Sequence, residues 1–237
     1  MRNFYEKHEV LFACLWIAAY CFVISPVKGN FGFESIWMLL ALALFSISIT
    51  VFVKSNHYEK KFGIDGWPEN TKRYLYFIPM WILATGNLWD GISLSYHGFD
   101  LVIAVINMAI VGYAEEMLFR GFLFTALLSE NKKNAAVIIS AVTFGSGHIV
   151  NIFSGQSNIE TFLQIIFAIS WGFILTLVFY KSGSLILCIT AHSMIDVFSL
   201  FGADNKSADL IYIVVTIVVG TAYCLYLNQL REDNEKQ

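Results

Sequence analysis

Long apolar runs separated by short polar stretches dominate this chain. A helix that crosses a lipid bilayer needs about 20 mainly apolar residues. Eight segments approach this requirement, namely residues 10–26, 35–53, 73–89, 100–128, 134–153, 159–180, 183–201 and 208–228. The first and third are short or irregular, and Pro79 predicts a kink in the third. The pattern predicts an all-α, polytopic transmembrane bundle of about eight spans.

The polar stretches between these segments are short. The longest covers residues 54–72 and contains the turn-like run 63–68. No Gly/Ser-rich linker, low-complexity segment or clear internal repeat divides the sequence. We therefore expect residues 1–237 to form a single transmembrane domain. The first apolar run lacks a small-residue cleavage site after it, so we expect it to be a retained helix and not a signal peptide.

Basic residues are distributed unevenly between the two sides of the predicted bundle. With eight crossings, both termini and the connections after spans two, four and six share one side. That side carries twelve basic residues: Arg2, Lys7, Lys54, Lys60, Lys61, Lys72, Arg73, Lys132, Lys133, Lys181, Arg231 and Lys236. The other side carries Lys28 and Lys206, and Arg120 lies inside a span. Because positive residues accumulate in the cytoplasm, the bias predicts an even number of spans with both termini cytoplasmic.

The composition supports lipid as the main solvent. Hydrophobic residues make up 57% of the 237 positions and charged residues 14%, whereas about a quarter of a soluble domain is charged. The net charge of −3 provides no basic field for nucleic acid, so we expect no nucleic-acid partner. The four cysteines lie in apolar runs without zinc-ligand spacing or a disulfide framework, which is typical of small buried residues.

Three charged residues interrupt the fourth apolar segment: Glu115, Glu116 and Arg120. Each charge costs about 2.5–3.5 kcal/mol on insertion scales, so an intramembrane charge indicates a functional site. Glu116 and Arg120 are four residues apart and can pair along one helix face. Glu115 lies about 100° around the helix from Glu116, which leaves it free to face another neighbour. A carboxylate that an adjacent ion pair does not consume suits a general base.

Two later segments carry histidines. His148 follows the small residues 145–147, which allow close approach of a helix or a substrate backbone. His192 and Asp196 are four residues apart and share one helix face. Either histidine alone would more often be a satisfied core residue. Because buried polar groups need partners, we expect these residues and the Glu-Glu-Arg cluster to surround one polar, hydrated cavity.

This set of residues suits amide hydrolysis. The sequence shows no reliable Ser-His-Asp order, no nucleophile elbow and no His-Glu-x-x-His zinc helix. A carboxylate with histidines can activate water directly or through a metal. Histidine and Asx side chains can also donate hydrogen bonds to an oxyanion.

The order Glu115-Glu116-x-x-x-Arg120, Phe144-x-x-x-His148 and His192-x-x-x-Asp196 resembles the CPBP family. This family includes the type II CAAX prenyl endopeptidases and the bacterial Abi proteins. The resemblance covers residues 100–201, the expected catalytic core, and the first three apolar segments carry no motif. It implies an intramembrane endopeptidase in which Glu115 activates water and His148 helps to hold that water.

The resemblance also implies roles for the remaining motif residues. Arg120 would pair with Glu116 and order the site, and His192 and Asp196 would sit at the oxyanion. This chain departs from the family pattern at Asp196, where relatives with a prenyl-protein role carry Asn. An ionised Asp cannot donate a hydrogen bond. Asp196 must therefore be protonated, orient His192 or help to bind a metal.

The sequence leaves the cofactor open. The family is named as metallopeptidases, and a metal-free glutamate mechanism is also argued for it. The metal ligands would be Glu115, His148, His192 and Asp196, which could hold zinc or another divalent ion. The metal-free alternative uses the same residues on water alone.

The expected partners are the lipid bilayer and a peptide or protein substrate within it. By resemblance, bacterial members act in bacteriocin immunity and in maturation of secreted or signalling peptides, which suits a multi-pass protein of a bacterial plasma membrane. Two alternatives differ in class. One is a proton-coupled transporter, which would favour paired halves with matching broken helices that are not found here. The other is a non-catalytic bacteriocin-immunity membrane protein that binds a partner through the same bundle.

Overall fold

The computed structural model describes residues 1–68, 75–129 and 133–230, which form helices and connecting loops without a β-strand. The basic positions 72, 73, 132, 231 and 236 lie outside these ranges. The helices are α1 (Arg2–Lys7), α2 (Glu9–Phe31), α3 (Ile36–Ser55), α4 (Ile78–Ala84), η2 (Gly86–Leu88), α5 (Gly98–Glu116), η3 (Met117–Phe124), α6 (Thr125–Ser129), α7 (Lys133–Gly147), η4 (His148–Ser154), α8 (Asn158–Ser182), α9 (Leu185–Ser199) and α10 (Lys206–Gln229).

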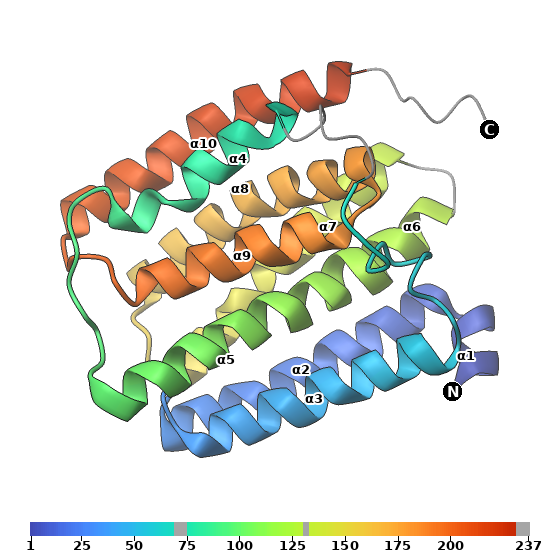
Figure 1. The fold of residues 1–237 in the computed structure, drawn as a ribbon, viewed down its shortest axis with the longest axis horizontal. Helices are drawn as coiled ribbons and strands as arrows, with labels where there is room; N and C mark the ends of the chain where they lie inside the picture. Colours follow the sequence, from blue (N-terminus) through green and yellow to red (C-terminus); the bar gives the residue numbers. More distant parts are fainter. Residues whose placement is uncertain (69–74, 130–132, 231–237) are drawn as a thin grey trace.

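Six helical stretches in the described part of the chain are long and apolar enough to cross a membrane. They are Glu9–Phe31, Ile36–Ser55, Gly98–Ser129, Lys133–Ser154, Asn158–Ser182 and Lys206–Gln229. The third and seventh expected segments instead contain the shorter apolar helices Leu75–Ala84 and Leu185–Ser199. Both run alongside the long helices (Figure 1). The all-α membrane bundle is confirmed, while eight complete crossings and the orientation of the termini stay predictions.

The helices form a bundle with α5 and α9 near its centre (Figure 1). Helix α5 packs against α3 on one side and α9 on the other, and α8 packs between α7 and α10. Helix α1 and the last turn of α10 lie at the same end of the bundle (Figure 1). This placement is what an even number of traverses requires.

Two prolines lie within the helices. Pro79 lies in the first turn of α4, directly after a 3-10 turn at residues 75–77, and the expected kink at this residue stays a prediction. Proline is tolerated there because its missing N–H would be unpaired anyway. Pro26 instead lies inside α2, which continues to Phe31 and beyond the predicted end of the first segment. Neighbouring helices can compensate a proline in a membrane helix.

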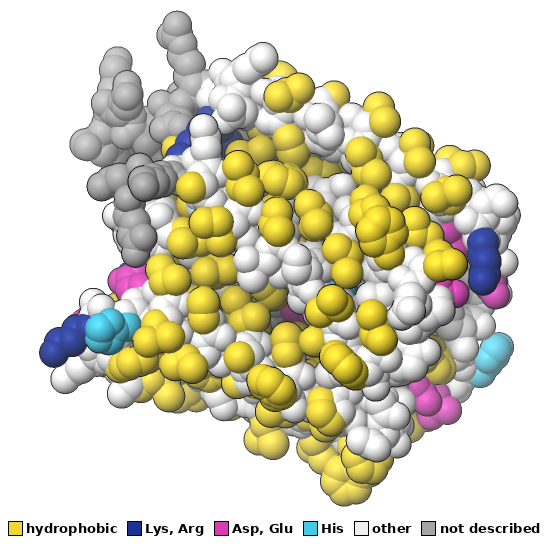
Figure 2. All heavy atoms as spheres, turned by 180° about the vertical axis from the view of Figure 1, so that it is seen from behind, with side chains coloured by type: hydrophobic (Ala, Val, Ile, Leu, Met, Phe, Trp, Pro, Cys, Tyr) yellow, Lys and Arg dark blue, Asp and Glu magenta, His cyan; other side chains and the backbone are white. Residues whose placement is uncertain are grey.

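The outer surface of the bundle is apolar between two polar ends. Figure 2 shows hydrophobic side chains spread over the middle of one face, with charged and histidine side chains at its margins. Large apolar side chains such as Phe22 and Leu44 are exposed. A lipid-facing surface has this character, because lipid tails solvate such side chains and water does not.

Small residues bring the site-bearing helices together. A Cβ added to Gly112 of α5 would lie 2.4 Å from Ser193 Oγ and 2.9 Å from Ser193 N of α9. A Cβ at Gly172 of α8 would lie 2.9 Å from the backbone of Ala141 on α7. Glycine at these positions permits a close backbone approach, as is common between membrane helices. The polar side chains of α5, α7 and α9 are thereby placed within reach of one another.

Candidate intramembrane active site

An ion pair at the centre of the bundle joins Glu116 and Arg120. Arg120 donates from one terminal guanidinium nitrogen to Glu116 Oε1 at 2.7 Å, and both side chains are fully buried. Arg120 also donates to Thr176 Oγ1 and to the carbonyl oxygen of Gly172, both at 3.3 Å. Its guanidinium carbon lies 4.3 Å from the ring centre of Phe144. The pairing expected from the four-residue spacing is confirmed, and α8 supplies further acceptors for the guanidinium.

The same carboxylate holds His192. His192 Nδ1 lies 2.8 Å from Glu116 Oε1. A carboxylate that is paired with Arg120 accepts hydrogen bonds, so Nδ1 carries the proton and donates. Glu116 therefore fixes the imidazole of α9 as well as the guanidinium of its own helix. The four-residue spacing predicts only the pair with Arg120, and the bond to His192 comes from the packing of α9 against α5.

The other imidazole nitrogen faces two carboxyl groups. His192 Nε2 lies 3.4 Å from Asp196 Oδ2 and 3.8 Å from Glu115 Oε2. His192 and Asp196 lie on one face of α9, as their spacing predicts. A hydrogen bond between them needs a proton on Nε2 or on the Asp196 carboxyl group, because two unprotonated acceptors would repel each other.

Glu115 points away from the ion pair. It takes a different direction from Glu116, and its Oε1 accepts a hydrogen bond from Tyr20 OH of α2 at 3.2 Å. Its other oxygen, Oε2, is the one near His192. The side chain of Glu115 is 13% exposed, whereas that of Glu116 is fully buried. Tyr20 thus holds one carboxylate oxygen of Glu115, Oε1, and the other oxygen, Oε2, lies on the side of His192.

His148 begins the short helix η4, directly after α7 ends at Gly147. Its ring packs edge-on against Phe144 at 5.6 Å, and the ring of His192 packs against the same Phe144 at 5.4 Å. Phe144 therefore sets the positions of both histidines. It also contacts Arg120, so this residue of the second motif links all three motifs.

One cavity of about 420 Å³ contains the predicted chemistry. Glu115, His148, His192 and Asp196 all line it, while Glu116 and Arg120 lie behind its wall. The expectation that the motif residues surround one cavity holds for these four residues, from three motif helices, and does not hold for Glu116 and Arg120. The catalytic roles of these residues remain a proposal.

The cavity also contains polar residues that sequence reasoning missed. Tyr20 and Lys28 reach it from α2, which carries no motif. Lys28 Nζ donates to Asn151 Oδ1 at 3.2 Å, and Asn151 Nδ2 donates to Gln164 Oε1 at 2.9 Å. The only sequence signal for Lys28 was a basic residue close to the end of an apolar run. Such a position more often indicates a side chain that extends to the membrane surface.

The helix changes its winding directly after the two glutamates. Residues Met117–Phe124 form a π-helix in which every residue is buried. Wider π turns are rare and occur often at functional sites, because they shift side chains relative to a regular α-helix. Here the change begins between Glu116 and its partner Arg120.

The expected metal ligands do not form a metal site in this arrangement. Within residues 1–68, 75–129 and 133–230, no group of three or more His, Cys, Asp or Glu side chains is placed to hold a metal ion. His192 uses Nδ1 for Glu116, which leaves only Nε2 for any further ligand. Metal binding and the metal-free alternative both stay predictions to be tested.

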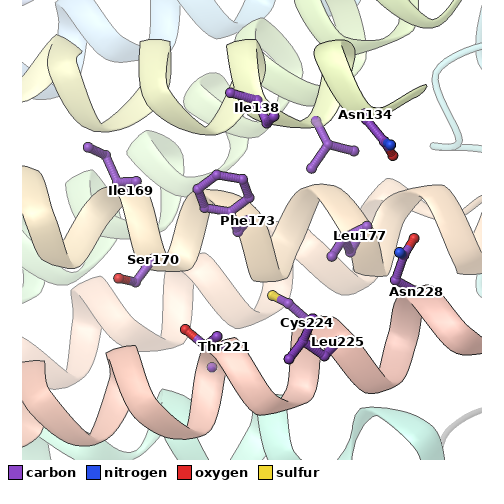
Figure 3. Close-up of a pocket in the computed structure, with 12 residues that line it drawn as sticks. Asn134, Ile138, Ile169, Ser170, Phe173, Leu177, Thr221, Cys224, Leu225 and Asn228 are labelled. Carbon is purple, nitrogen blue, oxygen red and sulfur yellow. The ribbon is translucent and has the colours of Figure 1, made fainter. Parts of the chain in front are cut away.

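A larger cavity of about 530 Å³ lies elsewhere, between α7, α8 and α10 (Figure 3). Its lining is mainly apolar and includes Ile138, Phe173 and Leu225, and the polar residues Asn134 and Asn228 lie toward the same end (Figure 3). None of the motif residues lines it. A cavity without an acid or a histidine offers no general base, so the chemistry belongs to the smaller cavity.

Comparison with known proteins agrees with the motif assignment. The family described as "Type II CAAX prenyl endopeptidase Rce1-like" matches residues 97–198. This segment begins just before α5 and ends just before the end of α9, so it contains all six motif residues. No curated protein and no solved structure matches the chain. The resemblance expected over residues 100–201 is confirmed as far as residue 198.

Proposed function

We propose that this chain, which is related to the type II CAAX prenyl endopeptidases through residues 97–198, hydrolyses a peptide bond of a membrane-associated or secreted peptide. The reaction takes place inside the bundle, and the nucleophile is a water molecule that Glu115 activates. One observation carries the proposal: Glu115, His148, His192 and Asp196 line a single cavity. Such a cavity brings water to a general base inside a lipid environment that supplies none.

Glu115 acts as the general base. Its Oε2 takes a proton from the water as the water oxygen attacks the carbonyl carbon of the scissile bond. Tyr20 holds the other carboxylate oxygen, so only one oxygen needs to reach the water. His148 lines the same cavity and helps to hold this water. The proton on Glu115 then passes to the leaving amine as the C–N bond breaks.

His192 stabilises the charge that develops on the carbonyl oxygen. With a proton on Nε2, the imidazole donates toward Asp196 in the resting site and toward the oxyanion during the reaction. Asp196 keeps that proton directed into the cavity. In this role Asp196 only accepts a hydrogen bond. An Asp can therefore serve at this position, where the prenyl-protein relatives carry Asn.

Glu116 and Arg120 position the histidine. Both are fully buried, so neither touches the substrate. Arg120 pairs with Glu116, and Glu116 fixes the direction of His192, which carries a proton on both ring nitrogens in this role, through a 2.8 Å bond to Nδ1. An oxyanion donor must be placed before the reaction begins, because a donor that has to reorient loses much of its effect.

Cleavage of a quenched peptide library by the purified protein in detergent tests this proposal. The wild type and a Glu160→Gln control, which alters an exposed acid at the start of α8, should cleave the same peptides. A Glu115→Gln protein of equal stability should not. Failure of the wild type to cleave any peptide, with solute transport or partner binding in its place, would support the carrier or the immunity alternative.

A further inference from the structure

We infer that the catalytic cavity opens on the extracytoplasmic face of the membrane and takes polypeptides that present their cleavage site on that side. That the substrate is a polypeptide rests on the proposed function. The direction in which the cavity opens rests on the structure and on the distribution of charge. The substrates would be exported chains or segments anchored at the outer surface, and cytosolic tails would have no access.

The lysines identify the two ends of the bundle. One end carries Lys54, Lys60, Lys61, Lys133 and Lys181. Contacts join its parts, since Lys61 pairs with Glu9 at 2.6 Å and Lys181 donates to the carbonyl oxygen of Leu230 at 2.6 Å. The opposite end carries Lys28 and Lys206. By the positive-inside rule the lysine-rich end is cytoplasmic and the end with Lys28 is not.

The cavity extends from the middle of the bundle to the end with Lys28. Besides Lys28, its lining includes Phe33 after α2, Tyr96 before α5 and Ser199 at the last turn of α9. These positions lie in the last turns of helices or in the connections between them on the lysine-poor side. The segment before α5 is tied to the end of α9, because Ser95 N donates to the carbonyl oxygen of Leu200 at 3.0 Å.

Exposure rises along the site in the same direction. The side chains of Glu116 and Arg120 are 0% exposed, that of His192 is 8% exposed and that of Asp196 is 23% exposed. Ser199, one turn further along α9, is an exposed residue. Water therefore reaches the catalytic groups from the end at which α9 terminates.

Aromatic rings close the lysine-rich end on the side of α1, α2, α3 and η3. Phe12 of α2, Phe52 of α3 and Phe122 of η3 pack with ring centres 4.8 to 5.9 Å apart. Tyr5 of α1 and Phe62 of the loop after α3 complete the cluster. Each of these five residues is at most 4% exposed. A dry, close-packed layer of this kind admits neither water nor a peptide.

The loop after α3 closes the start of α9. Leu185 N donates to the carbonyl oxygen of Gly63 at 2.7 Å, and Ser184 Oγ donates to the carbonyl oxygen of Gly66 at 2.8 Å. A Cβ at Gly63 would lie 2.4 Å from the carbonyl oxygen of Gly183, so the loop sits directly on the helix end. The cytoplasmic approach along α9 is therefore occupied by the chain itself.

Cysteine labelling tests the inference without reference to activity. The parent protein has its four native cysteines replaced by alanine, and single cysteines are then introduced at matched serines. Ser55 and Ser199 end α3 and α9, are both exposed, and each donates to a carbonyl oxygen three residues earlier. A third position, Met108→Cys, places the thiol inside the cavity. A small membrane-impermeant methanethiosulfonate is added to intact cells or to inverted vesicles.

The expected result is that Ser199→Cys and Met108→Cys react in intact cells, while Ser55→Cys reacts only in inverted vesicles. Labelling of Ser55→Cys in intact cells would overturn the orientation. A Met108→Cys protein that is labelled only from the cytoplasmic side, or from neither side, would overturn the extracytoplasmic opening. Each outcome is independent of whether the protein cleaves peptides.

A second measurement needs no cysteine substitution, so it still tests the inference if the cysteine-free parent does not fold. An impermeant quenched peptide that the detergent-solubilised wild type cleaves is offered to intact cells and to inverted vesicles, with cells that express Glu115→Gln as the background. Cleavage at least tenfold faster in intact cells is expected. Equal or faster cleavage in inverted vesicles would contradict the inference while leaving the peptidase function in place.

Discussion

Glu116 and His192 are joined by a 2.8 Å hydrogen bond between Oε1 and Nδ1, across 76 positions of sequence. The same Glu116 oxygen receives the guanidinium of Arg120 at 2.7 Å. The first glutamate of the pair therefore faces the cavity, and the second connects two helices beneath it. Because the two adjacent carboxylates have different surroundings, we expect different effects from substituting Glu115 and from substituting Glu116.

Glu116→Gln should lower stability and activity together. Removing the negative charge leaves Arg120 uncompensated in a buried site, which typically costs about 3–5 kcal/mol. It also replaces the charged acceptor that orients His192 with a neutral amide oxygen, which is a weaker acceptor. Thermal unfolding in detergent and the cleavage rate measure the two effects, with Glu115→Gln as the matched control that keeps wild-type stability. A Glu116→Gln protein as stable and active as wild type would remove the ion pair from the account.

Tyr20→Phe should reduce turnover and leave the fold intact. The phenol donates to Glu115 Oε1, and a hydrogen bond to a charged group contributes about 1.5–3 kcal/mol. We expect kcat to fall by about tenfold or more with little change in KM, since each 1.4 kcal/mol is a factor of ten. Tyr113→Phe is the control, because Tyr113 OH pairs with Thr50 Oγ1 at 2.7 Å. Equal losses in both variants would indicate a structural role for Tyr20.

Gly112→Ala should disturb the contact between α5 and α9. The new methyl group would lie within 3.0 Å of the Ser193 backbone, so the two helices have to separate. Overpacking of this kind typically costs about 1–3 kcal/mol. It should also lower the cleavage rate, because His192 lies next to Ser193. Gly66→Ala, which meets nothing within 4 Å, is the matched control. Unchanged unfolding temperature and rate in Gly112→Ala would show that the approach is not required.

Cleavage should not require a bound metal. The described residues offer no group of three placed ligands, and His192 Nδ1 is already engaged. Elemental analysis of the active, detergent-purified protein should find less than about a tenth of an equivalent of any transition metal. Dialysis against a chelator should leave the rate unchanged. Loss of activity on chelation, with recovery on addition of Zn²⁺ or another divalent ion, would contradict this prediction.

The local parts of the site could be predicted from the sequence. Residues four apart on a helix share a face whatever the rest of the fold does, so the pairs Glu116–Arg120 and His192–Asp196 followed from spacing. The meeting of three motif helices followed from the cost of burying unpaired polar groups. Helix spacing and the cost of burying a polar group can both be read from the sequence without knowing which helices are neighbours.

The contributions of α2 could not be predicted in this way. Tyr20 and Lys28 enter the cavity because α2 packs beside η3 and η4, and nothing in an apolar run specifies that neighbour. The π-helical winding after Glu116 likewise depends on tertiary packing of a fully buried segment. The short helices α4 and α9 show the same limit, since hydropathy predicted their presence but overestimated their length.

The cleavage rates of Glu115→Ala, His148→Ala and the double variant test the central claim most directly. If both residues act on one water, each single loss should be about 10²–10⁴-fold. The double variant should then be little slower than the slower single variant, because residues that act as a unit are strongly non-additive. All three proteins should keep the unfolding temperature of the wild type. Losses that multiply would assign the two residues to separate steps, and undiminished cleavage by Glu115→Ala would contradict the proposed mechanism.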